Sequence, residues 1–365
     1  MAMETIMKDG KYNYSAHACK VVTVVSVLVL SVVLSSCGDP SRDRIVLEAK
    51  KELESVDPVM GDWQGGWKLS DGGYSGELAA QVIALGEGKY RANILEGFDL
   101  TIPAVAVLDS QREDGAVRFA GPGEYDGMEL QLKAVIEDGK LTGSFTTEDM
   151  AGSVAMERVV RLSPTLGAKP PAGAIVLFNG EDFKKWKHTG KKADEDSVRW
   201  RLVDGAMEVK PGTGSIITRK EFADVKLHLE FRTPFMPEAR GQGRGNSGVY
   251  LQGRYEVQVL DSYGLEGKDN ECGGIYRVAP PLINMCAPPT QWQTYDITFR
   301  AARLDSAGKK QDAYTTVIHN GVKIHDNVKV SKATTAAPGG DVGGIYLQDH
   351  GNRVQYRNIW LVEQN

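Results

Sequence analysis

Short runs of alternating apolar and polar residues cover most of the chain, and Gly-rich and Asp-Gly turn signals separate them. This is the pattern of β-strands that bury one face. The runs form two blocks, residues 61–162 and 175–365, and the segment 163–174 between them contains three prolines. A Pro-rich composition is typical of a stiff linker. The pattern therefore predicts an all-β protein with two domains.

The first block, residues 61–162, has the strand spacing of a small antiparallel β-sandwich or barrel. Trp63 and Trp67 stand near its start. Either these rings line a sugar-stacking surface, or they plug the end of a barrel, which is the more common arrangement. No residue pattern in this block indicates a particular chemistry, so its role stays open.

The second block, residues 175–365, carries many short strands over nearly two hundred residues. Strands in this number and at this spacing favour two sheets packed face to face, as in a jelly roll.

Three strands of the second block carry polar residues on one side only. Val249 and Leu251 alternate with Tyr250 and Gln252, and the strands near 256 and 346 alternate in the same way. Successive side chains of a strand point to opposite faces, so the aliphatic residues belong to the core. Tyr, Gln and Glu flanked by Gly suit a face that hydrogen-bonds and stacks on sugars. The alternative is an ordinary solvated sheet face.

The N-terminal residues have the features of an export signal. Val21 to Leu34 is an almost unbroken apolar run, too short to span a bilayer comfortably, and Leu34-Ser35-Ser36-Cys37 follows the pattern of a bacterial lipoprotein signal. We therefore expect a signal peptide over 1–36, lipidation of Cys37 and a tether over 37–60. The protein would then be anchored in the bacterial cell envelope, facing the periplasm or the exterior. The alternative is an ordinary secreted protein.

Charge and composition narrow the function classes. The 365 residues include 43 Lys and Arg against 48 Asp and Glu, which gives a net charge of −5, and no long basic run is present. This balance argues against a nucleic-acid partner. The 41 Gly and 13 Tyr suit short strands joined by tight turns.

Four cysteines are present, and two of them fall in the leader or at the lipidation site. Cys272 and Cys286 remain, and in an exported protein they are most simply a structural disulfide. A zinc pair is the weaker interpretation, because no Cys-x-x-Cys spacing or nearby His accompanies them.

One strand carries a candidate acid–base group. Glu256 and Gln258 share a face, and a bulge at Leu260 would bring Asp261 round to it. The spacing resembles the catalytic strand of laminarinase-type glycosidases, in which acidic residues take all three places. Here the middle residue is Gln258, which exchanges no proton, so ordinary two-carboxylate hydrolysis is disfavoured.

Several ordered motifs extend across the second block. They are LFNG at 177–180, NSGVYLQG at 246–253, YEVQVLD at 255–261, CGGIY at 272–276, WQTY at 292–295, GIYLQDHG at 344–351 and RNI at 357–359. Together they resemble the 3-keto-disaccharide hydrolase family, over residues of about 174–363. The resemblance implies a concanavalin A-like jelly roll that acts on 3-keto-glycosides or 3-keto-disaccharides.

The resemblance also implies a mechanism. A ketone at sugar carbon 3 acidifies the hydrogen on carbon 2, so a base can form an enolate that expels the group on carbon 1, and water then adds. The expected roles are Glu256 or His350 as base or acid, and Arg357 or a bound divalent cation on the keto oxygen. Asp261 would orient these groups. The sugar would be bound by Asn246, Tyr250, Gln252, Gln258, Tyr276 and Gln348.

Two other classes of function remain open from the sequence. A lectin-like module would use the same face without chemistry, and a conventional glycosidase would use Glu256 with Asp261 on unoxidised substrates. An enzyme that acts on 3-keto-glycosides, the favoured function, needs a partner oxidoreductase that makes the 3-keto sugar. No strong metal-ligand spacing is present, so the metal is left undefined.

Overall fold

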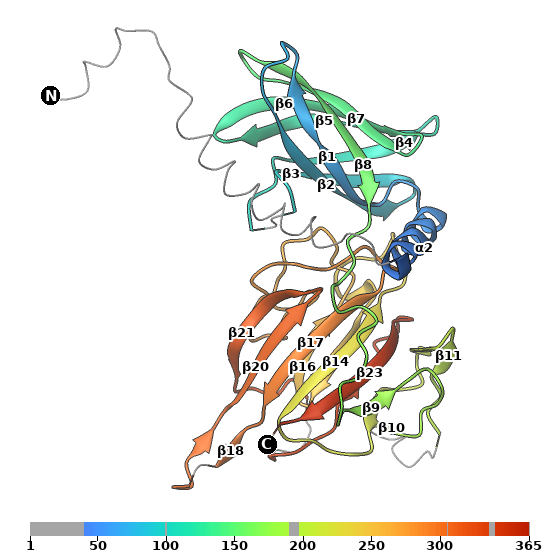
Figure 1. Ribbon diagram of the computed structural model, residues 1–365, viewed down its shortest axis with the longest axis vertical. Helices are drawn as coiled ribbons and strands as arrows, with labels where there is room; N and C mark the ends of the chain where they lie inside the picture. The colour runs from blue at the N-terminus through green and yellow to red at the C-terminus, as the bar shows by residue number, and fades with distance from the viewer. Residues whose placement is uncertain (1–39, 99–100, 190–196, 305, 336–339, 365) are drawn as a thin grey trace, which may run out of the picture. The chain divides into compact units, whose positions relative to one another are not determined.

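In the computed structural model, the first block of strands closes into a β-barrel (Figure 1). Eight antiparallel strands pair in chain order, and the last pairs with the first. This pairing settles the choice between sandwich and barrel. The strands are β1 (Gly61–Leu69), β2 (Ser75–Gly86), β3 (Lys89–Leu95), β4 (Ala106–Glu113), β5 (Ala116–Tyr125), β6 (Met128–Glu137), β7 (Lys140–Thr146) and β8 (Ala151–Val159).

Alternation along each strand explains the barrel. In β6 and β8, buried and exposed residues follow one another almost strictly, as expected where one face points into a lumen and the other into water. The helix α2 (Pro40–Val56) precedes the barrel, and one end of the barrel core is closed by Leu53 of its last turns and by Val59 and Met60 of the turn that follows. Leu53 belongs to the barrel core, and Asp57 accepts a hydrogen bond from the Tyr90 hydroxyl at 2.9 Å.

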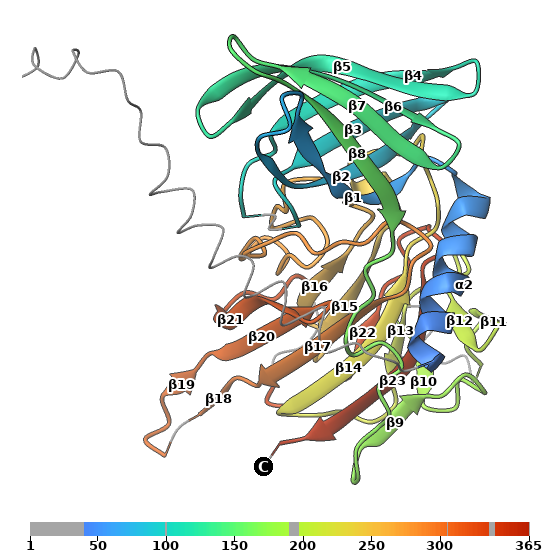
Figure 2. The same cartoon turned by 45° about the horizontal axis from the view of Figure 1, so that its top comes forward.

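The second block forms the two packed sheets of a jelly roll, as predicted (Figure 2). The smaller sheet has the order β10 (Trp186–His188), β13 (Ile216–Thr218), β22 (Tyr346–Leu347), β15 (Ser247–Leu251) and β16 (Tyr255–Val259). The larger sheet has the order β11 (Arg201–Val203), β12 (Ala206–Glu208), β23 (Gln355–Glu363), β14 (Val225–Arg232), β17 (Gln293–Arg300), β20 (Ala313–His319) and β21 (Val322–Val330). β9 (Ile175–Phe178) pairs with β23, β18 (Arg303–Leu304) pairs with β19 (Lys310–Gln311), and η3 (Gly241–Gly243) precedes β15.

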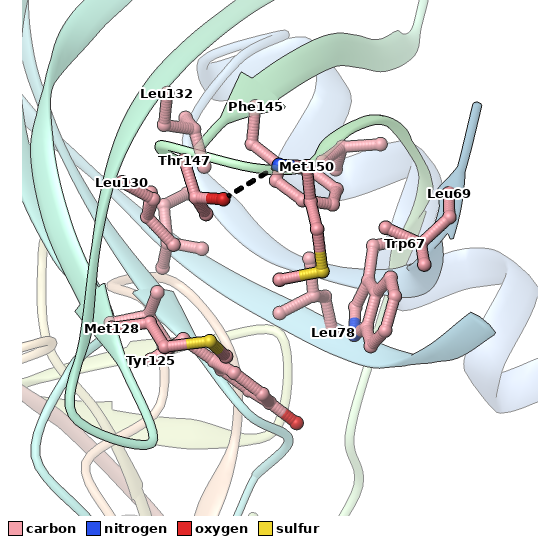
Figure 3. A pocket seen from close by; sticks show the side chains of 13 residues that line it. Trp67, Leu69, Leu78, Tyr125, Met128, Leu130, Leu132, Phe145, Thr147 and Met150 are labelled. Carbon is pink, nitrogen blue, oxygen red and sulfur yellow. Dashed lines mark hydrogen bonds between the residues drawn. The ribbon is translucent and has the colours of Figure 1, made fainter. Parts of the chain in front are cut away.

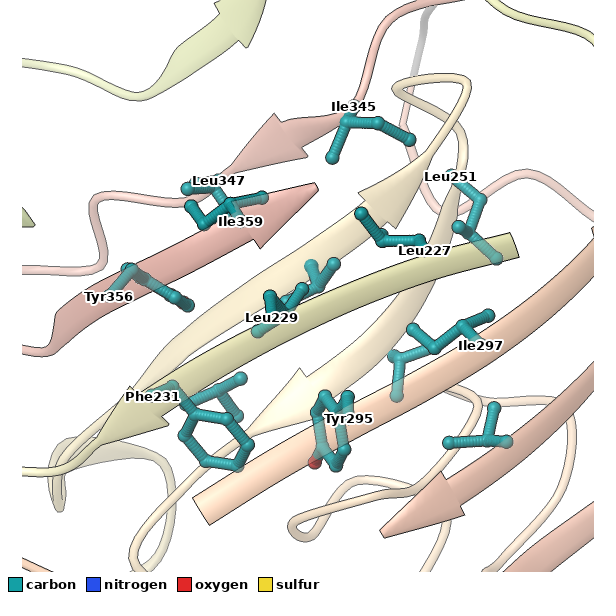
Figure 4. Close-up of a cluster of buried hydrophobic side chains, with 14 of the residues drawn as sticks. Leu227, Leu229, Phe231, Leu251, Tyr295, Ile297, Ile345, Leu347, Tyr356 and Ile359 are labelled. Carbon is teal, nitrogen blue, oxygen red and sulfur yellow. The ribbon is translucent and has the colours of Figure 1, made fainter. Parts of the chain in front are cut away.

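The jelly-roll core lies between the two sheets (Figure 4). Leu227, Leu229 and Phe231 alternate along β14 and point toward Leu251 and Leu347 of the smaller sheet. The residues between them, His228 and Glu230, therefore lie on the outer face of the larger sheet. This alternation gives the jelly roll two outer faces, and each of them carries a buried glutamate.

The predicted linker is held against the larger sheet. Thr165 donates to Asp296 at 2.7 Å, the Gly167 amide donates to Glu230 at 2.6 Å, and the Ala168 carbonyl accepts from Asn358 at 2.9 Å. Residues 49–365 form one compact unit. Within this unit, the buried Tyr263 hydroxyl donates to Asp62 of the barrel at 2.7 Å.

The structure describes residues 40–98, 101–189, 197–304, 306–335 and 340–364. The predicted signal peptide over 1–36 and the lipidation site at Cys37 lie outside these residues. Within the described ranges, no helix is both long enough and apolar enough to cross a membrane.

Candidate active site

The candidate acid lies on the outer face of the smaller sheet. Val257 and Val259 of β16 enter the core, so Glu256 and Gln258 point the other way, as alternation predicts. β16 is an edge strand, yet Glu256 is only 4% exposed. The loop that follows β16 covers this edge, because the Tyr276 amide donates to the Glu256 carbonyl at 3.1 Å and Gln258 exchanges backbone hydrogen bonds with Gly273 and Gly274.

The Glu256 carboxyl group has polar neighbours on its own sheet. It hydrogen-bonds the Tyr250 hydroxyl, and the Gln258 amide, with its nitrogen turned toward it, donates to Oε1 at 2.8 Å. It lies over Gly248, where a Cβ atom would come within 2.5 Å of Oε1. Any larger residue at 248 would therefore displace the carboxyl group.

Burial dominates the electrostatics of this group. Loss of solvent raises the pKa of Glu256 to about 7, although the Tyr250 hydrogen bond and the Arg277 charge act in the opposite direction. A carboxyl group with a pKa near 7 is both a usable base and a usable acid at neutral pH. This is the chemical property that a proton-transfer step requires.

Other predicted sugar-binding residues surround this acid. Gln348 Nε2 donates to the Tyr250 hydroxyl at 2.9 Å, and its Oε1 is buried without a hydrogen-bond partner in the described part of the chain. The Tyr250 and Tyr346 rings meet edge to face at 4.7 Å. Asn246 is buried, and its Nδ2 donates to the Gln242 carbonyl at 2.7 Å. Tyr276 is half-buried in the covering loop.

Asp261 does not share the hydrogen bonds of Glu256. Its carboxylate is buried in an ion pair with Arg244, in which Nε donates to Oδ2 at 2.7 Å. Burial raises the pKa of Asp261, and Arg244 opposes that rise. Leu260 packs into the core, and the residue after it is committed to a structural pair rather than presented beside Glu256.

Gln252 has a structural position as well. It adopts a left-handed conformation, with φ of 55°, in the turn between β15 and β16. Its Nε2 donates to the carbonyls of Phe222 and Asp341 at 3.1 and 2.8 Å, and its Oε1 accepts from Arg254 at 3.0 Å. The alternation ends with the strand at Leu251, so Gln252 turns away from Tyr250.

The expected placement of Arg357 on a keto oxygen beside Glu256 is corrected by the structure. Arg357 belongs to β23 of the larger sheet, where Nε donates to Glu230 at 2.6 Å and the guanidinium lies 4.0 Å from the centre of the Trp292 ring. The outer faces of two packed sheets point in opposite directions, so Arg357 does not reach a ligand at Glu256. His350 is exposed in the loop after β22, two residues beyond Gln348.

The predicted disulfide is not formed. Cys272 and Cys286 are free, buried thiols that hydrogen-bond each other. Cys272 Sγ also lies 3.3 Å from the Tyr295 hydroxyl, and Cys286 Sγ lies 3.4 Å from the Leu260 carbonyl oxygen. The sequence suggested the proximity of the pair, but these polar contacts satisfy the thiols without a covalent bond.

Two residues near the acid were not anticipated. Arg277 is exposed, its charge acts on Glu256, and it has a left-handed backbone with φ of 57°. Such strain in a non-glycine residue is common at functional sites. Gln242 bonds Asn246 from the loop before β15. Neither residue lies on a strand, so alternation could not reveal them.

A divalent cation does not fit this arrangement. Within the described ranges, no group of three or more His, Cys, Asp and Glu side chains is placed to hold a metal ion. Around Glu256 the neighbouring groups are a phenol and amides, which are weak ligands compared with carboxylates.

The other buried glutamate lies in a dense ionic network on the larger sheet. Burial by itself would raise the pKa of Glu230, but hydrogen bonds and charges from His228, Arg357 and Asn358 outweigh it and lower that pKa to about 2. Burial likewise opposes the charged form of His228, whose pKa is nevertheless raised by Asp296 and Glu230. His228 Nδ1 lies 2.6 Å from Asp296 Oδ1. This network holds the segment 163–174 against the sheet.

The jelly roll thus carries a buried acid among Tyr, Gln and Asn side chains, a set of groups that suits hydrogen bonding and stacking on a sugar. The family model described as 3-keto-alpha-glucoside-1,2-lyase-like domain matches residues 173–362. The chain therefore belongs to this family, as the sequence motifs predicted.

This chain is also similar to proteins of solved structure. A candidate glycosyl hydrolase from Parabacteroides distasonis is 34% identical, with a TM-score of 0.48, over 53% of this chain and 85% of that one. A second candidate glycosyl hydrolase from the same organism is 19% identical, with a TM-score of 0.40, over 53% of this chain and 94% of that one. The search of curated proteins found no match.

Proposed function

We propose that the jelly-roll domain cleaves 3-keto-glycosides or 3-keto-disaccharides by elimination followed by hydration. The observation that carries the proposal is the isolation of Glu256 as a buried acid whose hydrogen-bonding neighbours are neutral. Hydrolysis by a conventional glycosidase uses two carboxyl groups that flank the bond. Here the second acid of the motif, Asp261, is held by Arg244.

The first step is proton removal at sugar carbon 2. The Glu256 carboxylate takes the proton, and the electron pair of the C–H bond forms an enolate with its charge on the keto oxygen at carbon 3. Tyr250 and Gln258 orient the carboxylate, since both donate hydrogen bonds to it. We assign stabilisation of the enolate to Arg277, whose charge already acts on this site.

The second step is expulsion of the group on carbon 1. The enolate electron pair forms a double bond between carbons 1 and 2, the ketone is restored, and the carbon 1–oxygen bond breaks. Glu256, now protonated, returns its proton to the leaving oxygen. Water then adds a hydroxyl to carbon 1 and a hydrogen to carbon 2, so the net reaction is hydrolysis. A pKa near 7 allows one residue to perform both transfers.

The reaction class implies partners and a location, which we propose on the same basis. An oxidoreductase must first oxidise the hydroxyl on carbon 3, because an unoxidised sugar lacks the acidic hydrogen. We also propose that lipidation of Cys37 anchors the protein in the bacterial cell envelope.

The test compares a 3-keto-glucoside with its unoxidised parent, which carries the same leaving group. We expect wild-type protein to release sugar from the oxidised compound alone, with or without a chelator, and we expect Glu256→Gln to lower the rate about 10²- to 10⁴-fold. Asp261→Asn is the matched control, because Asp261 is a buried acid of the same motif.

Three results would contradict the proposal. Cleavage of the parent compound would establish a conventional glycosidase. Binding without cleavage would establish a lectin-like module. Loss of activity on addition of a chelator would require a metal that the described residues do not accommodate.

A further inference from the structure

The barrel contains a hollow that the proposed reaction does not use. A cavity of about 80 Å³ lies inside the barrel, and the surface that faces it is apolar (Figure 3). Trp67, Leu132, Phe145 and Met150 are among the residues that line it. The nearby Thr147 hydroxyl accepts a hydrogen bond from the Met150 amide at 3.0 Å, so it is already satisfied. With an apolar surface facing it, this cavity offers water few hydrogen-bond partners.

The two ends of the lumen differ. At the end closed by Leu53, Val59 and Met60, the lumen is filled by Trp63, which is fully buried and donates to the Val59 carbonyl at 3.1 Å. At the other end, the aromatic rings lie against the wall. A Cβ atom at Gly76 would come within 2.6 Å of the Trp67 ring, and one at Gly152 within 2.3 Å of the Phe145 ring. Glycine at these positions lets both rings pack sideways and leaves the lumen open.

The hollow end carries exposed apolar side chains. In a barrel whose strands run alternately up and down, the turns β1–β2, β3–β4, β5–β6 and β7–β8 lie at one end. Tyr74, Ile102 and Met128 belong to three of these connections and are 71%, 41% and 41% exposed. Met128 also lines the cavity. An apolar rim that continues into an apolar cavity marks a binding site for an apolar ligand.

The volume of the cavity limits which apolar groups can enter it. A cavity of about 150 Å³ accepts benzene, so one of about 80 Å³ is too small for a ring system but can take the end of a linear chain. The charged side chains at this end of the barrel determine which head groups are tolerated at the rim. Glu96, Asp126, Glu148 and Asp149 lie at this end against Lys68. An anionic head group at the rim would be repelled.

We propose that the barrel binds the end of a linear alkyl chain that carries an uncharged head group. The chain enters between Tyr74, Ile102 and Met128, and its terminal carbons contact Trp67 and Phe145. A free amphiphile and a membrane lipid of zero net charge both supply this chemistry.

The test uses quenching of tryptophan fluorescence by bromine at the end of an alkyl chain. In the full chain, we expect 12-bromododecan-1-ol to quench saturably, and we expect Trp67→Phe to remove most of that quenching. The matched anionic probe, 12-bromododecanoate at neutral pH, should bind at least tenfold more weakly, and the difference should shrink as salt is added.

A pair of identical substitutions locates the site. Val154 lines the cavity, whereas Val107 is 56% exposed on the outside of β4. We expect Val154→Phe to weaken binding of the alcohol at least tenfold and Val107→Phe to leave it unchanged, with far-UV circular dichroism checking the fold. If Val154→Phe does not fold, Met128→Ser at the rim replaces it, with a loss of at least threefold expected.

Vesicles of phosphatidylcholine with brominated acyl chains distinguish the two sources. Quenching by these vesicles assigns the chain to a membrane lipid, whereas quenching by the alcohol alone assigns it to a free amphiphile. The proposal is overturned by absence of saturable quenching, by tighter binding of the anionic probe, or by equal binding in folded Val154→Phe and Val107→Phe. None of these results bears on sugar release at Glu256.

Discussion

Glu256 and Glu230 occupy equivalent places on opposite sides of the jelly roll. Each lies on the outer face of one sheet, alternates with core residues and is almost fully buried, with exposures of 4% and 1%. Their pKa values nevertheless move apart, to about 7 for Glu256 and about 2 for Glu230. Burial is the same in kind at both sites, so the difference comes from the partners.

The neighbouring groups of the two glutamates account for the difference in their pKa values. Glu230 has His228, Arg357 and Asn358 beside it, and their hydrogen bonds together with the Arg357 charge favour its ionised form. Glu256 has a phenol and amides, with the exposed Arg277 as its nearby charge. A buried carboxylate with close cationic and amide partners stays ionised, whereas one with mainly neutral hydrogen-bonding partners can exchange protons near neutral pH. When the environment moves the pKa values of two acids in opposite directions, the acid whose pKa lies near neutral pH is the better candidate for proton transfer.

The largest expected effect is on the reaction rate, and it distinguishes the roles of the two glutamates. Glu256→Gln should lower the rate of sugar release from a 3-keto-glucoside about 10²- to 10⁴-fold, because the proton acceptor is lost. Glu230→Gln should leave the rate per folded molecule within about threefold of wild type. Steady-state assays on both variants, corrected for the folded fraction, measure this. Equal losses in the two variants would remove the distinction.

The next effect concerns stability. Glu230→Gln should lower the free energy of unfolding by roughly 3 kcal/mol, because it removes the carboxylate that pairs with Arg357 and leaves His228 with Asp296 as its one remaining acidic partner in this network. Urea unfolding at pH 7 measures the change. A loss below about 1 kcal/mol would show that the network is weak, as exposed ion pairs usually are.

The pH dependence of stability should have opposite signs at the two sites. The lowered pKa of Glu230 stabilises the fold above pH 4.5, and this contribution is lost as pH falls toward 2. The raised pKa of Glu256 favours the fold below pH 4.5, and this contribution is lost as pH rises through 7. Glu256→Gln should therefore match wild type at pH 4.5 and exceed its stability at pH 8, by roughly 3 kcal/mol for a shift of this size. Urea titrations at the two pH values decide the matter, and a variant that is less stable at pH 8 would contradict it.

A smaller effect should appear in the pH–rate profile. The Tyr250 hydroxyl favours the ionised form of Glu256. Tyr250→Phe should therefore move the pKa seen in kcat/KM upward by about one unit, since a hydrogen bond to a charged group contributes about 1.5–3 kcal/mol. Tyr346→Phe is the control, because its ring contacts Tyr250. A downward movement in Tyr250→Phe would show that this hydroxyl stabilises the neutral acid.

The smallest effect is expected at Arg357. This side chain is 34% exposed and pairs with Glu230, so Arg357→Lys should cost about 1 kcal/mol of stability and leave turnover unchanged. Thermal unfolding and sugar release are measured on the same sample. A large loss of turnover with intact folding would return Arg357 to the active site.

Local patterns in the sequence were sufficient to predict the positions of the strands and the face of the strand on which Glu256 lies. Alternation is a property of the extended backbone, so Val257 and Glu256 take opposite faces wherever the strand is placed. The family motifs extended this to the jelly roll as a whole. The closure of the barrel was beyond such reasoning, because it depends on pairing between β1 and β8 at the two ends of the block.

The sequence by itself determined an all-β chain with two blocks of strands, the family of the second block, and an acid on a polar strand face. Tertiary structure alone decided which groups meet. It placed Arg357 with Glu230 and Asp261 with Arg244, and it left Cys272 and Cys286 as thiols. The physical reason is that alternation fixes only the direction of a side chain, whereas its partners and its pKa depend on sheet order and on the loops that exclude water.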